Sequence, residues 1–481
     1  MFHIKPLAQL INEANETGTH TLKRTLTATN LVAIGVGVII GAGLFSLTGL
    51  AAANHSGPAI TLSLGVAALA CVFSALCYAE FSSMVPVAGS AYTYSYATLG
   101  EFFAWIIGWD LVLEYSVGAA TVAISWSQYL TRFLAKYNIV LPYQITLSPF
   151  ESATLQDGST VSGIINLPAM FVVLLITAII IRGAKESALY TTVVVGLKLI
   201  VVLVFIGLGW QYINPSNYQP YIPENTGTFG EFGISGILRG AGVVFFMFTG
   251  FDMVATMSQE AKNPKRDMPI GIIGSLIICT ILYALFGHVL TGMVHYTEFK
   301  NSAAPVAIAI DKTPYQWLGQ AIIIMILFGY TSVIVVDLMS QSRVFFSMSR
   351  DGLLPKIFSE IHPRFQTPYK SNIVLGLFIA LFAGLVPIRV VGEMTSIGTL
   401  LAFVMVCIGV LILRKRMPDA PRAFRTPWVP VVPILGILSC GVMMVALPTD
   451  TWIRLVIWLV LGLGIYFGYS RKHSNLNPTK A

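Results

Sequence analysis

The sequence predicts an all-α polytopic membrane protein with twelve transmembrane helices. Apolar residues make up 55% of the 481 residues and charged residues only 11%. The mean hydropathy of +0.76 lies outside the range of soluble globular domains. Twelve apolar runs reach or nearly reach the roughly 20 residues that span a hydrocarbon core. They cover residues 26–50, 58–83, 99–130, 164–182, 188–213, 233–259, 268–294, 315–343, 371–388, 394–414, 429–447 and 450–470.

Glycines interrupt the first and the sixth run. Gly35, Gly37, Gly41 and Gly43 fall within nine residues, and segment 240–252 places glycine and aspartate where hydrocarbon depth should exclude both. Unwound backbone at that depth needs polar partners, so a broken helix normally borders a ligand cavity. A close helix–helix crossing is the alternative use of such glycines. The five-run spacing predicts two inverted five-helix repeats, each beginning with a discontinuous helix.

The distribution of basic residues predicts the orientation in the membrane. Of 29 Lys and Arg residues, 21 fall on one side, seven on the other, and Lys198 lies inside the membrane. By the positive-inside rule, both termini are cytoplasmic and the protein is expected in the plasma (inner) membrane. The dispersed basic residues argue against nucleic acid. The expected organisation is a cytoplasmic N-terminus (1–25), repeat one (26–213), repeat two (214–414), helices 11 and 12 (415–470) and a cytoplasmic C-terminus (471–481).

Ionisable residues inside the apolar runs mark candidate functional groups, because charge at membrane depth is costly. Asp110 and Glu114 share a helical face, with Asp110 expected to be structural and Glu114 to face a cavity. Lys198 lies near the midplane, where desolvation favours the neutral amine. It is expected to exchange a proton or to hold carbonyls of a broken helix. Asp337 either pairs with Lys198 or faces the cavity as a counter-charge for a basic substrate.

The remaining polar groups at membrane depth are expected to be structural. Asp252 would brace the second break, and His288 would be a satisfied core histidine. Glu80 and Glu260, near helix ends, are expected to form ion pairs. The five cysteines all lie in apolar runs, so neither a disulfide framework nor a metal site is expected.

Several segments, in this order, resemble the amino acid–polyamine–organocation (APC) superfamily. They are residues 40–45, 108–115, 182–187, 250–252 with 262–269, and 349–355. Within the superfamily, the chain is most similar to the cationic amino acid transporter family in its bacterial form, over essentially its whole length. The resemblance implies two inverted five-helix repeats plus two extra helices, and amino acid transport by alternating access without a cofactor.

The resemblance also implies a substrate site at the two breaks. The substrate carboxylate would meet the N–H groups of Gly41, Ala42 and Gly43. The amino group would meet carbonyls near Val38, Ile39 and Ile40. It would also meet carbonyls at the second break, which involves Phe246, Met247 and Thr249. Phe246 would also close the site as an aromatic lid.

Lys198 matches the lysine that, in proton-coupled relatives, stands where sodium-coupled relatives bind sodium. Sodium-independent, proton-coupled transport is therefore expected. Three departures affect specificity: Ala42 lacks a hydroxyl group, Met247 is bulky, and Asp337 stands where an apolar residue is expected. Asp337 and Glu114 add negative character, which favours lysine, arginine or ornithine as substrate.

The expected partners are an amino acid, a proton and the lipid bilayer, and a small single-span membrane protein is a candidate subunit. The alternatives are a transporter of small neutral amino acids such as alanine or serine, an amino acid exchanger, and an amino acid sensor. An enzyme is not expected, because no metal-binding HExxH motif, catalytic carboxylate pair or phosphate-binding loop occurs.

Overall fold

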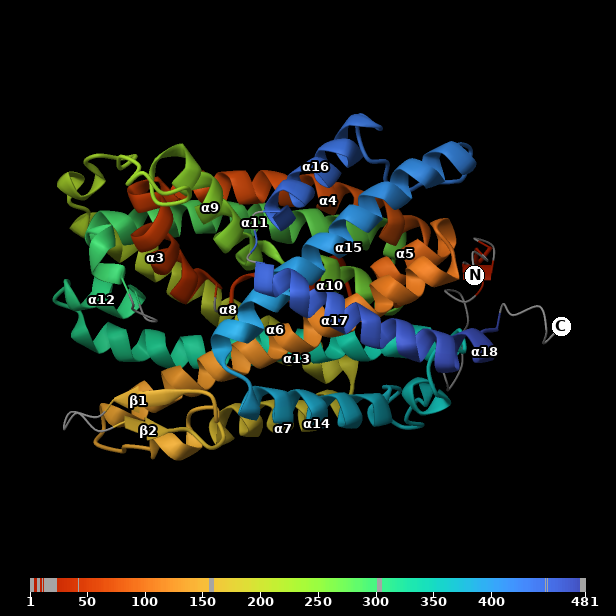
Figure 1. The fold of residues 1–481 in the computed structure, drawn as a ribbon, viewed down its shortest axis with the longest axis horizontal. Helices are drawn as coiled ribbons and strands as arrows, with labels where there is room; N and C mark the ends of the chain where they lie inside the picture. The colour runs from red at the N-terminus through yellow and green to blue at the C-terminus, as the bar shows by residue number, and fades with distance from the viewer. Residues whose placement is uncertain are drawn as a thin grey trace.

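The computed structural model describes residues 4–6, 9–10, 12, 24–41, 43–154, 160–300, 305–445, 447 and 449–475. Within these residues the fold is nearly all helical, with one small antiparallel hairpin of β1 (Ser152–Thr154) and β2 (Thr160–Ser162). The hairpin lies at one end of the long axis and both chain ends lie at the other (Figure 1). We call these the hairpin end and the termini end.

The helices run mostly along the long axis of the molecule (Figure 1). They are α2 (Ala28–Ile39), α3 (Thr48–Ala51), α4 (Ile60–Met84), α5 (Ala91–Thr98), α6 (Glu101–Ala135), α7 (Leu167–Ile181), α8 (Ala184–Gly209), α9 (Gly233–Phe245), α10 (Phe251–Thr256), α11 (Pro264–Met293), α12 (Pro305–Asp311), α13 (Gln316–Arg350), α14 (Tyr369–Leu385), α15 (Ile388–Arg416), α16 (Val431–Val445), α17 (Thr449–Ile465) and α18 (Arg471–His473).

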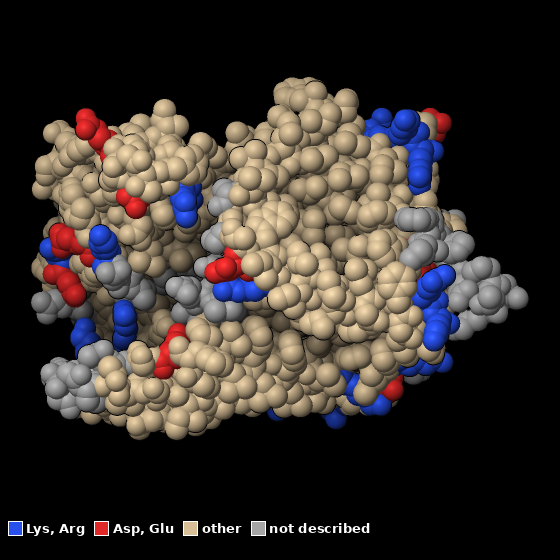
Figure 2. Space-filling view, in the orientation of Figure 1, with Lys and Arg blue, Asp and Glu red and all other residues tan. Residues whose placement is uncertain are grey.

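The molecule is a polytopic membrane protein. Among the described residues, seven helical segments are long and apolar enough to cross a membrane, and five more apolar helices are shorter. Each of the twelve predicted apolar runs overlaps one of these segments, while the number of membrane crossings stays a prediction. On the face in Figure 2, most charged side chains lie toward the two ends, one red and blue group lies left of the middle, and a broad area between that group and the termini end is free of charge. Such an area suits the hydrocarbon core.

The first predicted interruption is confirmed. Helix α2 begins at a capping box in which Thr27 and Asn30 bond reciprocally, and it ends at Ile39. The chain bends at Ile40 and Gly41 and resumes as a π-helical turn at Gly43–Leu47, followed by α3. Residues 43–56 therefore form the second half of this rod.

The second predicted interruption is also confirmed. Helix α9 passes into a 3-10 turn at Phe246–Phe248 and then into Gly250, whose φ is +125°. Only glycine adopts this backbone region without strain. Helix α10 then begins at Phe251, so the rod is split at the level where the first rod is split.

The predicted alternative, a close helix crossing, holds for one of the four glycines in the first run. A Cβ built on Gly35 would lie 2.5 Å from Oγ of Ser275 in α11. Gly35 therefore lets α2 approach α11 closely, whereas Gly41 and Gly43 lie at the break. Helix α2 also packs against α8, α10 and α13, and α6 runs along α13 and α15.

The termini end is closed by ion pairs that include both glutamates expected there. Glu80 accepts hydrogen bonds from Arg414 at 2.9 Å and Arg422 at 3.0 Å. Glu260 forms a buried ion pair with Arg343. These pairs join helices far apart in sequence and hold the termini end together.

Candidate functional site

The two helix breaks touch each other. A Cβ built on Gly43 would lie 2.4 Å from Cγ of Met247 and 3.1 Å from its Cα. A Cβ on Gly250 would lie 2.6 Å from Cγ1 of Val38. A side chain at either glycine would push the two rods apart, so glycine is what allows the breaks to meet.

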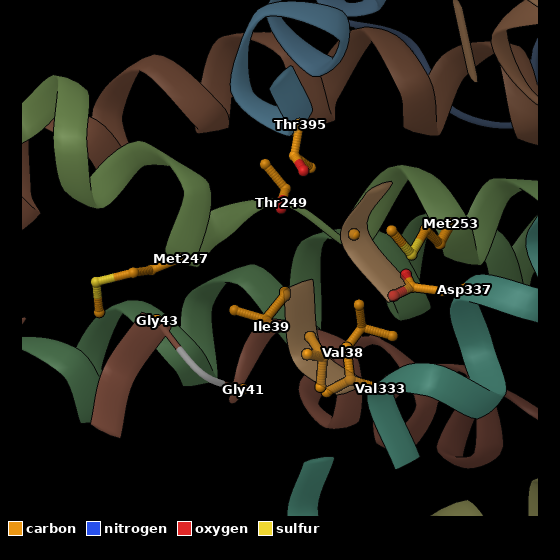
Figure 3. A pocket seen from close by; sticks show the side chains of 12 residues that line it. Val38, Ile39, Gly41, Gly43, Met247, Thr249, Met253, Val333, Asp337 and Thr395 are labelled. Atoms are coloured by element: carbon orange, nitrogen blue, oxygen red, sulfur yellow. The ribbon is translucent and has the colours of Figure 1, made fainter. Parts of the chain in front are cut away.

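A small cavity lies beside this contact. Its volume is about 30 Å³, which is room for about two water molecules. Figure 3 shows Gly43 and Met247 at one end and Asp337 and Met253 at the other, and the side chain of Asp337 extends from α13 into the space between them. The lining consists of Val38, Ile39, Gly41, Gly43, Gly118, Val122, Met247, Thr249, Met253, Val333, Asp337 and Thr395. Both breaks contribute to it, together with α6, α13 and α15.

Lys198 of α8 holds the end of α2. Its Nζ donates hydrogen bonds to the carbonyl of Gly37 at 2.6 Å and to the carbonyl of Ile40 at 2.7 Å, and the residue is only 2% exposed. Ser332 also donates to the Gly37 carbonyl, at 3.4 Å. The last carbonyls of a helix carry its negative partial charge, so a cation stabilises this end. Lys198 forms no ion pair with Asp337. Its two hydrogen bonds to carbonyls have the geometry expected of a lysine that holds the end of a broken helix.

Tyr283 of α11 connects the two breaks. Its hydroxyl lies within hydrogen-bond distance of the Ile39 carbonyl and, at 3.0 Å, of the Met247 carbonyl. A phenol has one proton, so it donates a full hydrogen bond to only one of them at a time. The other carbonyl then has an unused acceptor position.

The buried acids have different surroundings. Asp337 is 1% exposed, lines the cavity, and neither of its oxygens has a hydrogen-bond partner among the described residues. Asp110 and Glu114 are also fully buried without partners, but they lie against Gly398 of α15. Asp252 accepts from the backbone N–H of Gly250 and from the Tyr115 hydroxyl, both at 3.0 Å. It therefore braces the second break, as the sequence predicts.

The structure places most predicted site residues at the cavity. Gly41, Gly43, Met247, Thr249 and Asp337 line it, and Ile40 faces Lys198 through its carbonyl. Glu114 does not line it, because Gly118, one turn further along α6, takes that place. Ala42 and the side chain of Phe246 lie outside the described part of the chain.

Sequence reasoning missed part of the apolar lining and Tyr283. Val122 lies two turns beyond Glu114 on the same helical face, so helical spacing could have identified it. No comparable signal exists for Met253 and Val333, because an apolar side chain in a membrane helix indicates core or lipid contact equally well.

The chain matches the family model described as "Amino acid permease" over residues 26–465. The chain belongs to the amino acid permease family. Membership in this family places the permease in the APC superfamily, as its motifs indicate. It also identifies the protein as a membrane transporter rather than an enzyme.

Relatives of the permease share its full length. It is 44% identical to the branched-chain amino acid permease BcaP of Bacillus subtilis over 477 residues, covering 99% of both chains. It is 42% identical to the methylthioribose transporter of the same organism, again over 99% of both chains. It is 31% identical to the vacuolar cationic amino acid transporter 4 of Arabidopsis thaliana, over 96% of this chain and 94% of the relative.

Proposed function

We propose that this permease is a sodium-independent, proton-coupled transporter of amino acids that works by alternating access. The small cavity where the two split rods meet carries the proposal. An amino acid has a carboxylate and an ammonium group a few ångströms apart, and it needs a partner of each polarity. Half-helix ends supply N–H groups on one side and carbonyls on the other.

Backbone groups would bind both ends of the zwitterion. We assign the carboxylate to the N-terminal end of segment 43–56, because Gly41 and Gly43 line the cavity. We assign the ammonium to the carbonyls of Ile39 and Met247, one of which Tyr283 leaves with an unused acceptor position. The predicted contribution of Ala42 and the lid role of Phe246 stay predictions.

Lys198 supports sodium independence. Its ammonium lies against two carbonyls at the end of α2, where a bound metal cation would find the same negative partial charge. A buried amine can also lose its proton when the cavity opens, so proton exchange at Lys198 remains part of the proposal.

The first candidate substrates are neutral aliphatic amino acids of branched-chain size. Side chains of Val38, Val122, Met247, Met253 and Val333 supply most of the cavity wall, and they favour an aliphatic group. The similarity to the branched-chain permease of Bacillus subtilis agrees with this choice. Alanine and serine have smaller side chains and would contact fewer of these residues.

Basic amino acids are the second candidate. Asp337 extends into the cavity without a partner, and the ammonium or guanidinium group of lysine, ornithine or arginine would pair with it. Glu114 does not reach the lining, so one acid rather than two would provide the counter-charge.

We further propose that the termini end faces the cytoplasm and that the protein resides in the plasma membrane, as the excess of basic residues on that side favours. Lys5 pairs with Asp351 at 2.5 Å, and the Tyr92 hydroxyl donates to the same carboxylate at 2.6 Å. This pair would open whenever the cavity faces the cytoplasm. A single-span subunit stays a prediction.

Uptake into liposomes tests the proposal. Purified protein is reconstituted without sodium, and radiolabelled leucine, alanine, arginine and lysine are compared with and without an acid-outside pH gradient. We expect gradient-driven accumulation, strongest for leucine. A strict sodium requirement, or rates unaffected by the gradient, would contradict the coupling, and a preference for arginine would establish the second candidate. Efflux only in exchange for external substrate would show an exchanger.

A further inference from the structure

Among the described residues that line the cavity, Asp337 is the only ionisable one. It comes from the middle of α13, is 1% exposed, and its side chain lies beside Met253 at one end of the cavity (Figure 3). Across the cavity from α13, a Cβ on Gly118 of α6 would lie 3.5 Å from Oδ2 of Asp337. Helix α6 therefore leaves room for the carboxyl group but offers it no donor.

The ionisable groups nearest to Asp337 are acids. Asp252 of α10 and Glu114 of α6 are close enough to interact electrostatically with it, and Asp110 lies one turn beyond Glu114. Asp252 already accepts two hydrogen bonds, whereas Glu114 and Asp110 are unpartnered like Asp337. No cation on these two helices compensates Asp337.

Among the side chains that the structure describes, the other helices packed against α13 bring no cation to Asp337 either. Helices α2 and α7 contain no charged residue in their sequences. Lys198 of α8 is held by two carbonyls of α2, and Lys370 of α14 pairs with Glu360. On α13 itself, Arg343 pairs with Glu260. The remaining neighbours place their charges toward the ends of α13, with Asp311 at the end of α12 and Lys356 in the turn after α13.

An ionised carboxylate is not stable in such surroundings. Among the described residues it would have no hydrogen-bond donor and no counter-ion, and it would lie beside other acids. A neutral carboxylic acid carries no such cost. The proposed site binds the ammonium of a neutral amino acid at the carbonyls of Ile39 and Met247, and the aliphatic side chain of that substrate carries no charge. A proton would therefore neutralise Asp337 while the cavity is closed.

We propose that the Asp337 carboxyl group is a proton-binding site within the substrate cavity, distinct from Lys198. The carboxylate takes a proton from water when the cavity is open at the hairpin end, and it holds that proton while the cavity is closed. It returns the proton to water when the cavity opens at the termini end. The inference builds on the proposed proton-coupled transport of a neutral amino acid, and it names a group that would carry the proton alongside the substrate.

The transport test uses full-length Asp337→Asn, which keeps the shape of the side chain but cannot titrate. Across a gradient of about one pH unit, one coupled proton corresponds to about tenfold accumulation. We therefore expect the ratio of leucine accumulation to leucine counterflow without a gradient to fall about tenfold in Asp337→Asn relative to wild type. Asp337→Glu keeps a titratable group and should recover part of the accumulation.

Asp110→Asn is the matched control. It makes the same chemical change in another buried, unpartnered acid that does not line the cavity, so accumulation and counterflow should both stay near wild type. Equal accumulation by Asp337→Asn and wild type would overturn the inference. A loss confined to arginine and lysine, present also in counterflow, would show a substrate counter-charge and would overturn it too.

An infrared titration decides the point without transport. The C=O stretch of a protonated carboxylic acid is followed against pH in purified protein, with and without leucine. A leucine-sensitive component should be present in wild type and Asp110→Asn and absent in Asp337→Asn. Its persistence in Asp337→Asn would refute proton binding at Asp337. If wild type shows no gradient-driven accumulation, the coupling in the proposed function fails, while this titration still tests Asp337.

Discussion

Replacing Lys198 with methionine removes the cation at the end of α2 but keeps an unbranched side chain of similar length. Two hydrogen bonds disappear, to the carbonyls of Gly37 and Ile40. Ser332 remains within reach of the Gly37 carbonyl, but nothing described replaces the bond to Ile40. The perturbation therefore acts on the end of the half-helix that borders the first break.

The expected cost follows from these bonds. A hydrogen bond from a charged donor contributes about 1.5–3 kcal/mol. Two such bonds are lost, and relief from burying the ammonium offsets part of the loss, so we expect a net destabilisation of about 2–4 kcal/mol. For a chain of 481 residues the unfolding entropy is about 1 kcal/mol per kelvin. The unfolding temperature should therefore fall by about 2–4 °C.

The protein carries its own reporters for this measurement. All five cysteines are free and buried, so a thiol-reactive fluorophore labels them only as the protein unfolds. The control is Lys312→Met, which breaks an exposed ion pair with Glu298 at 2.9 Å. Exposed pairs contribute up to about 1 kcal/mol, so this variant should shift the unfolding temperature by about 1 °C or less.

Two outcomes would refute the reasoning. The first is an unfolding temperature of Lys198→Met within about 1 °C of wild type, since the expected loss is at least twice as large. The second is an equal shift in Lys312→Met, which would mean that any loss of a lysine has this effect. Either result would show that Lys198 does not hold the end of α2.

Three further perturbations test other parts of the molecule. Gly250→Ala should lower the transport rate about tenfold or more in folded protein, because a Cβ at φ +125° would lie 2.6 Å from Val38 and strain the second break; a wild-type uptake rate would contradict this. Glu80→Gln should lower the unfolding temperature more than Lys312→Met does, because removing one partner of a buried ion pair costs about 3–5 kcal/mol; equal shifts would show that its arginine pairs contribute little. Lys5→Met should raise the counterflow rate about tenfold or more, because removing one partner of the buried pair with Asp351 costs the closed state several kcal/mol; a slower exchange would argue against a closing role.

The sequence predicted the framework because the framework depends on strong local signals. Runs of apolar residues locate the helices, and glycines at membrane depth locate both breaks. Acids and a lysine in hydrocarbon are rare enough to identify Lys198 and Asp337. For Asp337 the sequence left two alternatives, and the structure places it at the cavity, away from Lys198.

The rest of the site depends on contacts that sequence patterns do not encode. Glu114 shares a helical face with Gly118, but depth along α6 decides which of them reaches the cavity. Val333 and Met253 look like any other apolar helix residues. Tyr283 acts through one hydroxyl aimed at two distant backbone atoms, and only the packing of α11 on α2 brings them together.

The shared hydroxyl of Tyr283 has a consequence for motion. Its two acceptors belong to different rods, so any rocking of one rod against the other must stretch one of the two contacts before the other. The Tyr283 hydroxyl would then donate its proton to the carbonyl of the rod that stays near. The carbonyl oxygen of the other rod would lose this hydrogen bond and would attract a cation. Arrival of an ammonium group at that oxygen would compensate the lost contact, so an empty carrier would meet more resistance to rocking than a loaded one.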